Sequence, residues 1–132
     1  MNSTLQTILL IEDEPLVRDG VAELLEDLGF TVSTAATARE TTRLLQQPDP
    51  RYRAVIIDLG LPDRSGTELA KDILAQLGGI PVIIASGSDR GDLDDVLAND
   101  VRVGFLAKPF GIRKIAEVFA GFGIASQERS SR

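Results

Sequence analysis

Residues 54–66 read AVIIDLGLPDRSG: an apolar run leads into an aspartate, and a turn-rich segment follows. The run from Ala54 to Ile57 predicts a buried strand that ends at Asp58. An ionised carboxylate at the end of an apolar run costs free energy unless it is solvated, paired with a charge or bound to a metal ion. Asp58 is therefore either a cap of a turn or helix or a functional residue, and the rest of the chain has to decide between these interpretations.

Apolar stretches of strand length alternate with amphipathic stretches along the whole chain. The predicted strands are Thr7–Ile11, Phe30–Ala35, Ala54–Asp58, Ile80–Ala85 and Val101–Ala107. The predicted helices are Pro15–Leu28, Thr37–Gln47, Thr67–Leu77, Asp92–Asn99 and Ile112–Ala120. The first, third and fourth strands are apolar on both faces, as a parallel sheet covered by helices requires. This pattern predicts an α/β fold, a doubly wound five-stranded parallel sheet with helices on both faces.

The composition excludes several classes of protein. The chain has 132 residues, no cysteine, no histidine and a net charge of −6. The length suits one domain, expected at residues 1–125, with a polar tail at 126–132. Without cysteine and histidine, a disulfide framework, a histidine-based triad and most zinc sites are excluded. The acidic balance argues against direct binding of nucleic acid. We see no signal peptide and no run long enough to span a membrane, and we expect a cytoplasmic protein.

Charged side chains follow three of the predicted strands. Glu12 and Asp13 come after the first strand, Asp58 ends the third, and Lys108 comes after the fifth. Because ligands bind at the carboxyl ends of the strands in such a sheet, we expect these side chains to meet in one cleft. Two carboxylates about 4 Å apart repel each other by about 4 kcal/mol at an effective dielectric constant of about 20. An all-oxygen site of this kind suits Mg²⁺, which keeps several of its water ligands.

The remaining strand-end residues suit a phosphoryl group. Lys108 adds a positive charge, Ser86 offers a hydroxyl donor, and Gly87 leaves a backbone N–H open beside it. A metal ion and an ammonium group together overcompensate a lone carboxylate, but they suit a carboxylate that gains a phosphoryl group of about −1.5 to −2 charges. Aspartate is a known nucleophile for this chemistry, so Asp58 is predicted to be phosphorylated.

Each of these features also has a simpler interpretation when it is taken alone. The acidic residues 12–14 before Pro15 fit capping of a helix, and Asp58 fits capping of a turn. Residues 86–88 fit an ordinary loop, and Lys108 fits a surface lysine. The simpler interpretations do not explain why all four features stand at the ends of different strands in one alternating pattern.

With these motifs the sequence resembles the receiver domains of response regulators, the phosphorylated partners in two-component signalling. The resemblance extends from about Thr7 to about Phe119. It is carried by Ile-Glu-Asp-Glu-Pro at 11–15, by the Asp58, Pro62, Gly66 spacing, by Ser86-Gly87 and by Phe105-x-x-Lys108-Pro109-Phe110. The resemblance implies the strand order 2-1-3-4-5, which is one of the common orders of the doubly wound fold.

The resemblance assigns the predicted metal ligands one by one. Asp58 resembles the phospho-acceptor, which also contacts the metal. Asp13 resembles the direct ligand of Mg²⁺, with Mn²⁺ as an alternative ion. Glu12 resembles a partner that acts largely through water, and the backbone carbonyl of Gly60 resembles the third protein ligand.

The resemblance also implies a conformational switch. Ser86 resembles the hydroxyl residue that moves to the phosphoryl group, and Lys108 resembles the lysine that binds it. Phe105 resembles the aromatic switch residue, but it lacks a tyrosine hydroxyl, so a switch here would act by packing. The expected output surface is the fourth helix, fifth strand and fifth helix, where Leu93, Val96 and Val118 would contact a downstream protein or a second copy of the chain. The expected upstream partner is a histidine kinase or a phosphotransfer protein.

Other functions fit the sequence less well. An aspartate-based phosphatase would need a second aspartate where Gly60 stands, and a flavin-binding module would need a hydroxyl-rich loop in place of the acidic residues 12–14. A degenerate receiver that acts without phosphorylation stays as an alternative. We expect a signalling domain and not an enzyme with a separate substrate. The initial Met and the short tail favour a stand-alone receiver over one cut from a longer regulator or hybrid histidine kinase.

Overall fold

Five parallel strands form one sheet in the order β2-β1-β3-β4-β5, as predicted. The computed structural model describes residues 6–87 and 94–126. The strands are β1 (Thr7–Ile11), β2 (Thr31–Ala35), β3 (Tyr52–Asp58), β4 (Val82–Ser86) and β5 (Val103–Ala107). The doubly wound order brings the ends of β1, β3 and β4 together in the middle of the sheet, where a ligand site is expected.

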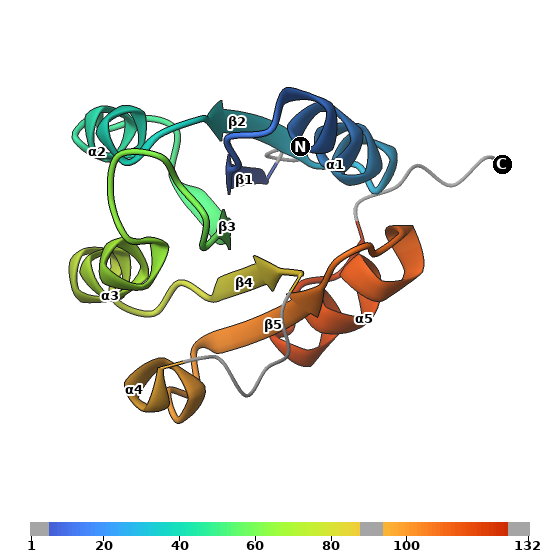
Figure 1. The fold of residues 1–132 in the computed structure, drawn as a ribbon. Helices are drawn as coiled ribbons and strands as arrows, with labels where there is room; N and C mark the ends of the chain where they lie inside the picture. Colours follow the sequence, from blue (N-terminus) through green and yellow to red (C-terminus); the bar gives the residue numbers. More distant parts are fainter. Residues whose placement is uncertain (1–5, 88–93, 127–132) are drawn as a thin grey trace, which may run out of the picture.

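In the described part of the chain, five helices cover the sheet: α1 (Pro15–Asp27), α2 (Ala38–Leu45), α3 (Gly66–Leu77), α4 (Asp95–Ala98) and α5 (Ile112–Gly121). In Figure 1, α1 and α5 lie on one side of the sheet, and α2, α3 and α4 lie on the other. No helix in the described part of the chain is both long and apolar enough to cross a membrane.

Two hydrophobic cores result from the alternation of side chains along each strand. Leu9 and Ile11 of β1 belong to the core that also contains residues of α2, α3 and α4, such as Leu69. Ile8 and Leu10 belong to the opposite core, with residues of α1 and α5. Both faces of the central strands are therefore buried, which explains why these strands are continuous apolar runs.

Two helices begin at N-caps, where a hydroxyl side chain accepts the backbone N–H of a glutamate three residues later. The Thr37 hydroxyl accepts the N–H of Glu40 at 3.0 Å before α2. The Ser65 hydroxyl accepts the N–H of Glu68 at 3.3 Å before α3. These caps place the start of α2 at Ala38, one residue later than predicted, and the start of α3 at Gly66, one residue earlier.

The prediction for β5 was wrong at its beginning. Val101 was predicted as the first residue of the strand, but its side chain is 90% exposed and the strand begins at Val103. The reason is a turn, in which the Asp100 carboxylate accepts the N–H of Arg102 at 2.8 Å. The described part of the fourth helix, α4, runs from Asp95 to Ala98 and is shorter than the predicted helix. The predicted start of this helix, Asp92, lies outside the described residues.

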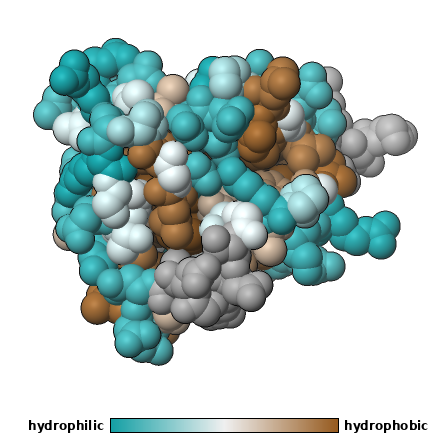
Figure 2. All heavy atoms as spheres, viewed as in Figure 1, coloured by the Kyte–Doolittle hydropathy of each residue, from teal (hydrophilic) through white to brown (hydrophobic). Residues whose placement is uncertain are grey.

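The surface carries few large apolar side chains. In the view of Figure 2, hydrophilic residues make up most of the surface, and hydrophobic residues are exposed in separate patches. Leu16 and Val96 are 86% and 65% exposed. The predicted tail lies outside the described residues except for Ser126, whose hydroxyl donates to the backbone oxygen of Leu28 at 3.4 Å.

Candidate functional site

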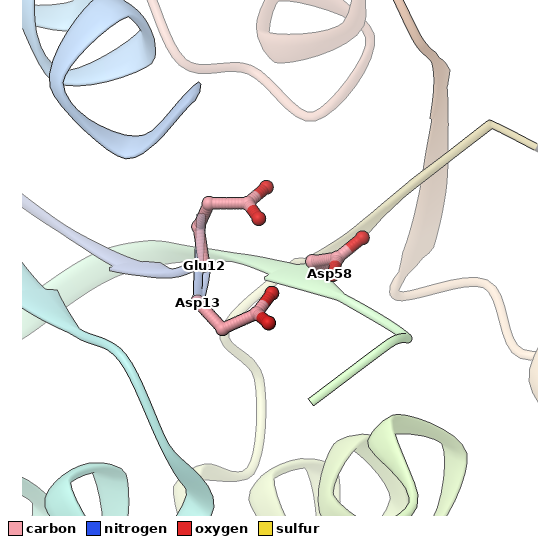
Figure 3. Close-up of side chains that lie close together, drawn as sticks. All are labelled: Glu12, Asp13 and Asp58. Atoms are coloured by element: carbon pink, nitrogen blue, oxygen red, sulfur yellow. The ribbon is translucent and has the colours of Figure 1, made fainter. Parts of the chain in front are cut away.

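Three carboxylates meet at the carboxyl ends of β1 and β3. Glu12 and Asp13 directly follow β1, and Asp58 is the last residue of β3. Each offers a carboxylate oxygen within 4.8 Å of those of the other two. Figure 3 shows the three labelled side chains close together where these strands end. The structure thus brings together the acidic residues that the sequence analysis placed in one cleft.

Lys108 joins this group from the end of β5. Its Nζ donates to Glu12 Oε1 at 2.8 Å and to Asp58 Oδ1 at 3.0 Å. Burial alone lowers the pKa of Lys108, but its hydrogen bonds to the Glu12 and Asp58 carboxylates and their negative charges outweigh burial, so the pKa lies above its usual value. The lysine is therefore protonated at neutral pH and compensates part of the negative charge.

Glu12 is held firmly, whereas Asp13 is free to bind a ligand. Glu12 is only 3% exposed, and its Oε2 accepts the N–H of Glu14 at 3.2 Å. Arg18, one turn into α1, donates to the backbone oxygen of Glu12 at 3.1 Å. Within residues 6–87 and 94–126, the half-buried side chain of Asp13 makes no hydrogen bond or ion pair. Its oxygens are therefore available to a cation.

Asp58 lies at the point where β3 turns toward α3. Its Oδ2 accepts the N–H of Gly60 at 3.2 Å, so the chain bends around the carboxylate. A Cβ atom at the exposed Gly60 would stand 3.4 Å from Asp58 Oδ2, an ordinary contact distance. The absence of a side chain at position 60 therefore leaves the approach to Asp58 open.

The other predicted site residues, Ser86, Gly87 and Phe105, lie in β4, at the residue after it and in β5. Ser86 ends β4, and its backbone oxygen accepts the N–H of Lys108 at 2.8 Å. Gly87 is exposed directly after it. Phe105 lies on β5 opposite Ile84, half-buried against the core formed with α2, α3 and α4. Ser86 follows Ala85, which pairs with Asp58 in the sheet, whereas Phe105 lies two residues before the end of β5.

The chemistry of the site fits a hard divalent cation. Its donors are carboxylate oxygens, and the chain has no cysteine or histidine to attract a softer metal. Mg²⁺ binds such sites through one or two carboxylates and completes its shell with water. Asp13 and Asp58 are partly exposed and can supply those carboxylates, with Glu12 behind them.

Sequence reasoning missed two residues that organise this region, Arg18 and Asp63. Arg18 could have been suspected, because it lies on the first turn of a helix that begins just after the acidic residues. Asp63 carried no such signal. It accepts backbone N–H groups of residues 24 and 25 positions earlier in the chain.

Comparison with known proteins gives a consistent result. The sequence model of the response regulator receiver domain matches residues 8–120. The sensor kinase CckA of Brucella abortus is 31% identical over 110 residues, which are 83% of this chain and 12% of that protein. The KDP operon transcriptional regulatory protein KdpE of Escherichia coli is 35% identical over 109 residues, 82% of this chain and 47% of that protein. The chain thus spans less than half the length of either relative.

Solved structures agree with the sequence comparison. A CheY-like response regulator receiver domain from Methylobacillus flagellatus is 29% identical, with a TM-score of 0.77 over 90% of this chain and 99% of that one. The receiver domain of sensor histidine kinase PA1611 from Pseudomonas aeruginosa, with a magnesium ion coordinated in its active site cleft, is 25% identical, with a TM-score of 0.75 over 91% and 99%. The strand order, the cluster at the strand ends and the match over residues 8–120 lead to one conclusion: this chain belongs to the response regulator receiver domain family.

Proposed function

We propose that Asp58 accepts a phosphoryl group in a two-component phosphorelay and that Mg²⁺ is required for the transfer. The main support is the charge arrangement, in which Lys108 bonds Asp58 and Glu12 while Asp13 has no partner among the described residues. The site is thus prepared for one more cation and for a strongly negative group on Asp58. Receiver domains pair with histidine kinases or phosphotransfer proteins, and a phosphohistidine of such a partner is the donor we propose.

The transfer can be written with its bonds. A carboxylate oxygen of Asp58 attacks phosphorus, the P–N bond to the donor imidazole breaks, and the imidazole nitrogen keeps the electron pair and takes a proton. Asp13, the Asp58 carboxylate and the Gly60 carbonyl would hold Mg²⁺, with Glu12 acting through water. When bound, the ion supplies positive charge against the phosphoryl oxygens. Lys108, the Ser86 hydroxyl and the Gly87 N–H would donate to the same oxygens.

Phosphorylation would then shift an existing equilibrium between two conformations. Lys108 exchanges its bonds to the carboxylates for the phosphoryl group, Ser86 follows, and the half-buried Phe105 turns further inward. The output surface would be α4, β5 and α5, where a downstream protein or a second copy of the chain binds. Val96 is 65% exposed on this surface and Val118 is half-buried, whereas Leu93 lies outside the described residues. Amide NMR shifts at residues 94–120 on adding beryllofluoride would support this route, and their absence would contradict it.

The assignment of Asp58 is tested by intact mass after incubation with acetyl phosphate and Mg²⁺. The wild-type chain should gain one phosphoryl group, Asp58→Asn none, and EDTA should prevent the gain. Asp27→Asn is the matched control, because Asp27 is exposed at the end of α1 and should leave labelling unchanged. Undiminished labelling of Asp58→Asn would overturn the assignment, and a wild-type chain that takes no label from acetyl phosphate or from a phosphohistidine donor would overturn the function.

A further inference from the structure

The side chain of Asp63 ties the segment after Asp58 to the beginning of α2. Its Oδ1 accepts the N–H of Ala38 at 2.9 Å, and its Oδ2 accepts the N–H of Arg39 at 3.1 Å. The first N–H groups of a helix have no partner within the helix, so the carboxylate satisfies two of them. These hydrogen bonds, that of Ala38 foremost, lower the pKa of Asp63, and the carboxylate is ionised at neutral pH.

The same segment is fixed at two further points. Near its beginning, the N–H of Gly60 donates to Asp58 Oδ2 at 3.2 Å. At its end, the N–H of Gly66 donates to the backbone oxygen of Leu59 at 3.3 Å, and a Cβ at Gly66 would stand only 2.5 Å from Leu59 Cα. Between these points the chain rises beside α2 in Figure 1, and Asp63 makes the contact there.

The beginning of α2 is also bonded to the other side of the carboxylate cluster. The N–H of Glu12 donates to the backbone oxygen of Ala35 at 2.9 Å. The next residue, Ala36, donates its N–H to Glu40 Oε1 at 2.6 Å. A continuous set of hydrogen bonds and chain segments therefore runs from Glu12 through the start of α2 to Asp63. These contacts link the loop between β1 and α1, which carries Glu12 and Asp13, with the loop between β3 and α3, which carries Gly60.

We propose that Asp63 is a positioning residue of the metal site: by holding the segment after Asp58 against α2, it keeps the Gly60 backbone in place relative to Asp13. This inference rests on the proposed function, because it assumes that the Gly60 carbonyl is a ligand of Mg²⁺. A backbone ligand cannot select its place by changing rotamer, so it binds well only where its segment is held. Without the Asp63 carboxylate, the segment 61–64 would lose the hydrogen bonds that Asp63 makes to the first residues of α2.

The test is isothermal titration of the full chain with Mg²⁺. Asp63→Ala should weaken Mg²⁺ binding about tenfold, the lower end of the range known for outer partners of metal ligands. Asp63→Asn keeps an oxygen that can accept one of the two N–H groups, so Mg²⁺ binding by this variant should be only about threefold weaker than that of the wild type. Asp100→Ala is the matched control, because the Asp100 carboxylate also accepts a backbone N–H, that of Arg102, but at the amino end of β5. It should lower the urea midpoint of unfolding and leave Mg²⁺ affinity unchanged.

A second measurement does not depend on metal. In amide NMR spectra of the chain in EDTA, Asp63→Ala should shift the Gly60 signal together with those of Ala38 and Arg39, and Asp100→Ala should shift none of them. If Asp63→Ala does not fold, Asp63→Asn decides in both measurements. Wild-type Mg²⁺ affinity and an unshifted Gly60 signal in the Asp63 variants would overturn the inference while leaving the proposed function intact. A wild-type chain that binds no Mg²⁺ would overturn both.

Discussion

At the residue scale, the cleft carries more negative than positive charge, because three carboxylates share one lysine. Lys108 bonds Glu12 and Asp58, and Asp13 stands within 4.8 Å of the same carboxylates without a partner in the described part of the chain. Asp13 is therefore repelled by its neighbours whenever no cation is bound. Functional sites commonly keep such unfavourable arrangements because the ligand removes them.

Asp13→Asn should stabilise the chain in EDTA and should do so less when Mg²⁺ is present. Two unit charges about 4 Å apart in water repel by about 1 kcal/mol, and Asp13 is only half-buried, so we expect a gain of about that size. The free energy of unfolding in urea, followed by circular dichroism with and without Mg²⁺, checks this. Asp19→Asn, at an exposed position of α1, is the control and should change little. A less stable Asp13→Asn chain in EDTA would show that repulsion does not govern this residue.

The sequence was sufficient to predict which charged residues meet, but not how they are held. Glu12, Asp58 and Lys108 are recognisable because each charge directly follows an apolar strand and the ends of parallel strands converge. Arg18 and Asp63 bind backbone atoms, which every residue carries, so no pattern of residue types marks their partners. Positions of this kind become visible only when the fold brings distant segments together.

At the element scale, the boundaries follow from caps and turns more than from hydrophobicity. The N-caps before α2 and α3 have clear sequence signatures, and both helices were predicted to within a few residues. Apolar Val101 was assigned to β5, but Asp100 and Arg102 form a turn at that point. A local hydrogen bond thus overrode the apolar pattern, and the strand begins two residues later.

Arg102 joins this turn to the end of α3. Its Nη1 donates to the backbone oxygens of Leu74 at 3.0 Å and Gly78 at 2.6 Å, and its Nη2 donates to Asp100 Oδ2 at 2.7 Å. The guanidinium therefore satisfies carbonyl groups at the C-terminus of the helix, where a cation is also favoured by the helix dipole.

Arg102→Ala should lower the urea midpoint of unfolding, because the charged guanidinium bonds two backbone oxygens at the end of α3 and the Asp100 carboxylate. Arg102→Lys should recover less than half of the loss, because an ammonium group cannot reach three acceptors in a planar fork. Urea unfolding measures both variants. Lys114→Ala removes an exposed ion pair with Glu117 and should cost less than about 0.5 kcal/mol. Equal losses in the Arg102 and Lys114 variants would mean that the cap of α3 has no special role.

At the scale of the whole molecule, one lysine connects three strands. The sheet order places β3 between β1 and β4, with β5 at the edge, and Lys108 at the end of β5 reaches Glu12 after β1 and Asp58 at the end of β3. The ion pairs therefore join the edge of the sheet to its centre above the strand ends. Lys108 itself lies in the chain between β5 and α5, two of the elements of the proposed output surface.

This connection predicts how stability depends on pH. The pKa of Lys108 is raised in the folded chain, so the folded state binds its proton more tightly than the unfolded state does. The resulting stabilisation is complete below the pKa of the unfolded chain, about 10.4 for lysine, and is lost as the pH rises through the folded pKa. At neutral pH, Lys108→Met should therefore be less stable than the wild type, because the buried Glu12 carboxylate loses its counter-ion.

The difference in unfolding free energy between the wild type and Lys108→Met should narrow as the pH is raised from neutral to about 11 and beyond. Urea unfolding in EDTA at a series of pH values measures this difference without interference from metal. Lys114→Met, which removes an exposed lysine, is the matched control and should show a small difference that changes little with pH. If the difference for Lys108→Met stays constant over the whole alkaline range, the charge of the lysine does not stabilise the fold, and its place between Glu12 and Asp58 serves phosphoryl binding alone.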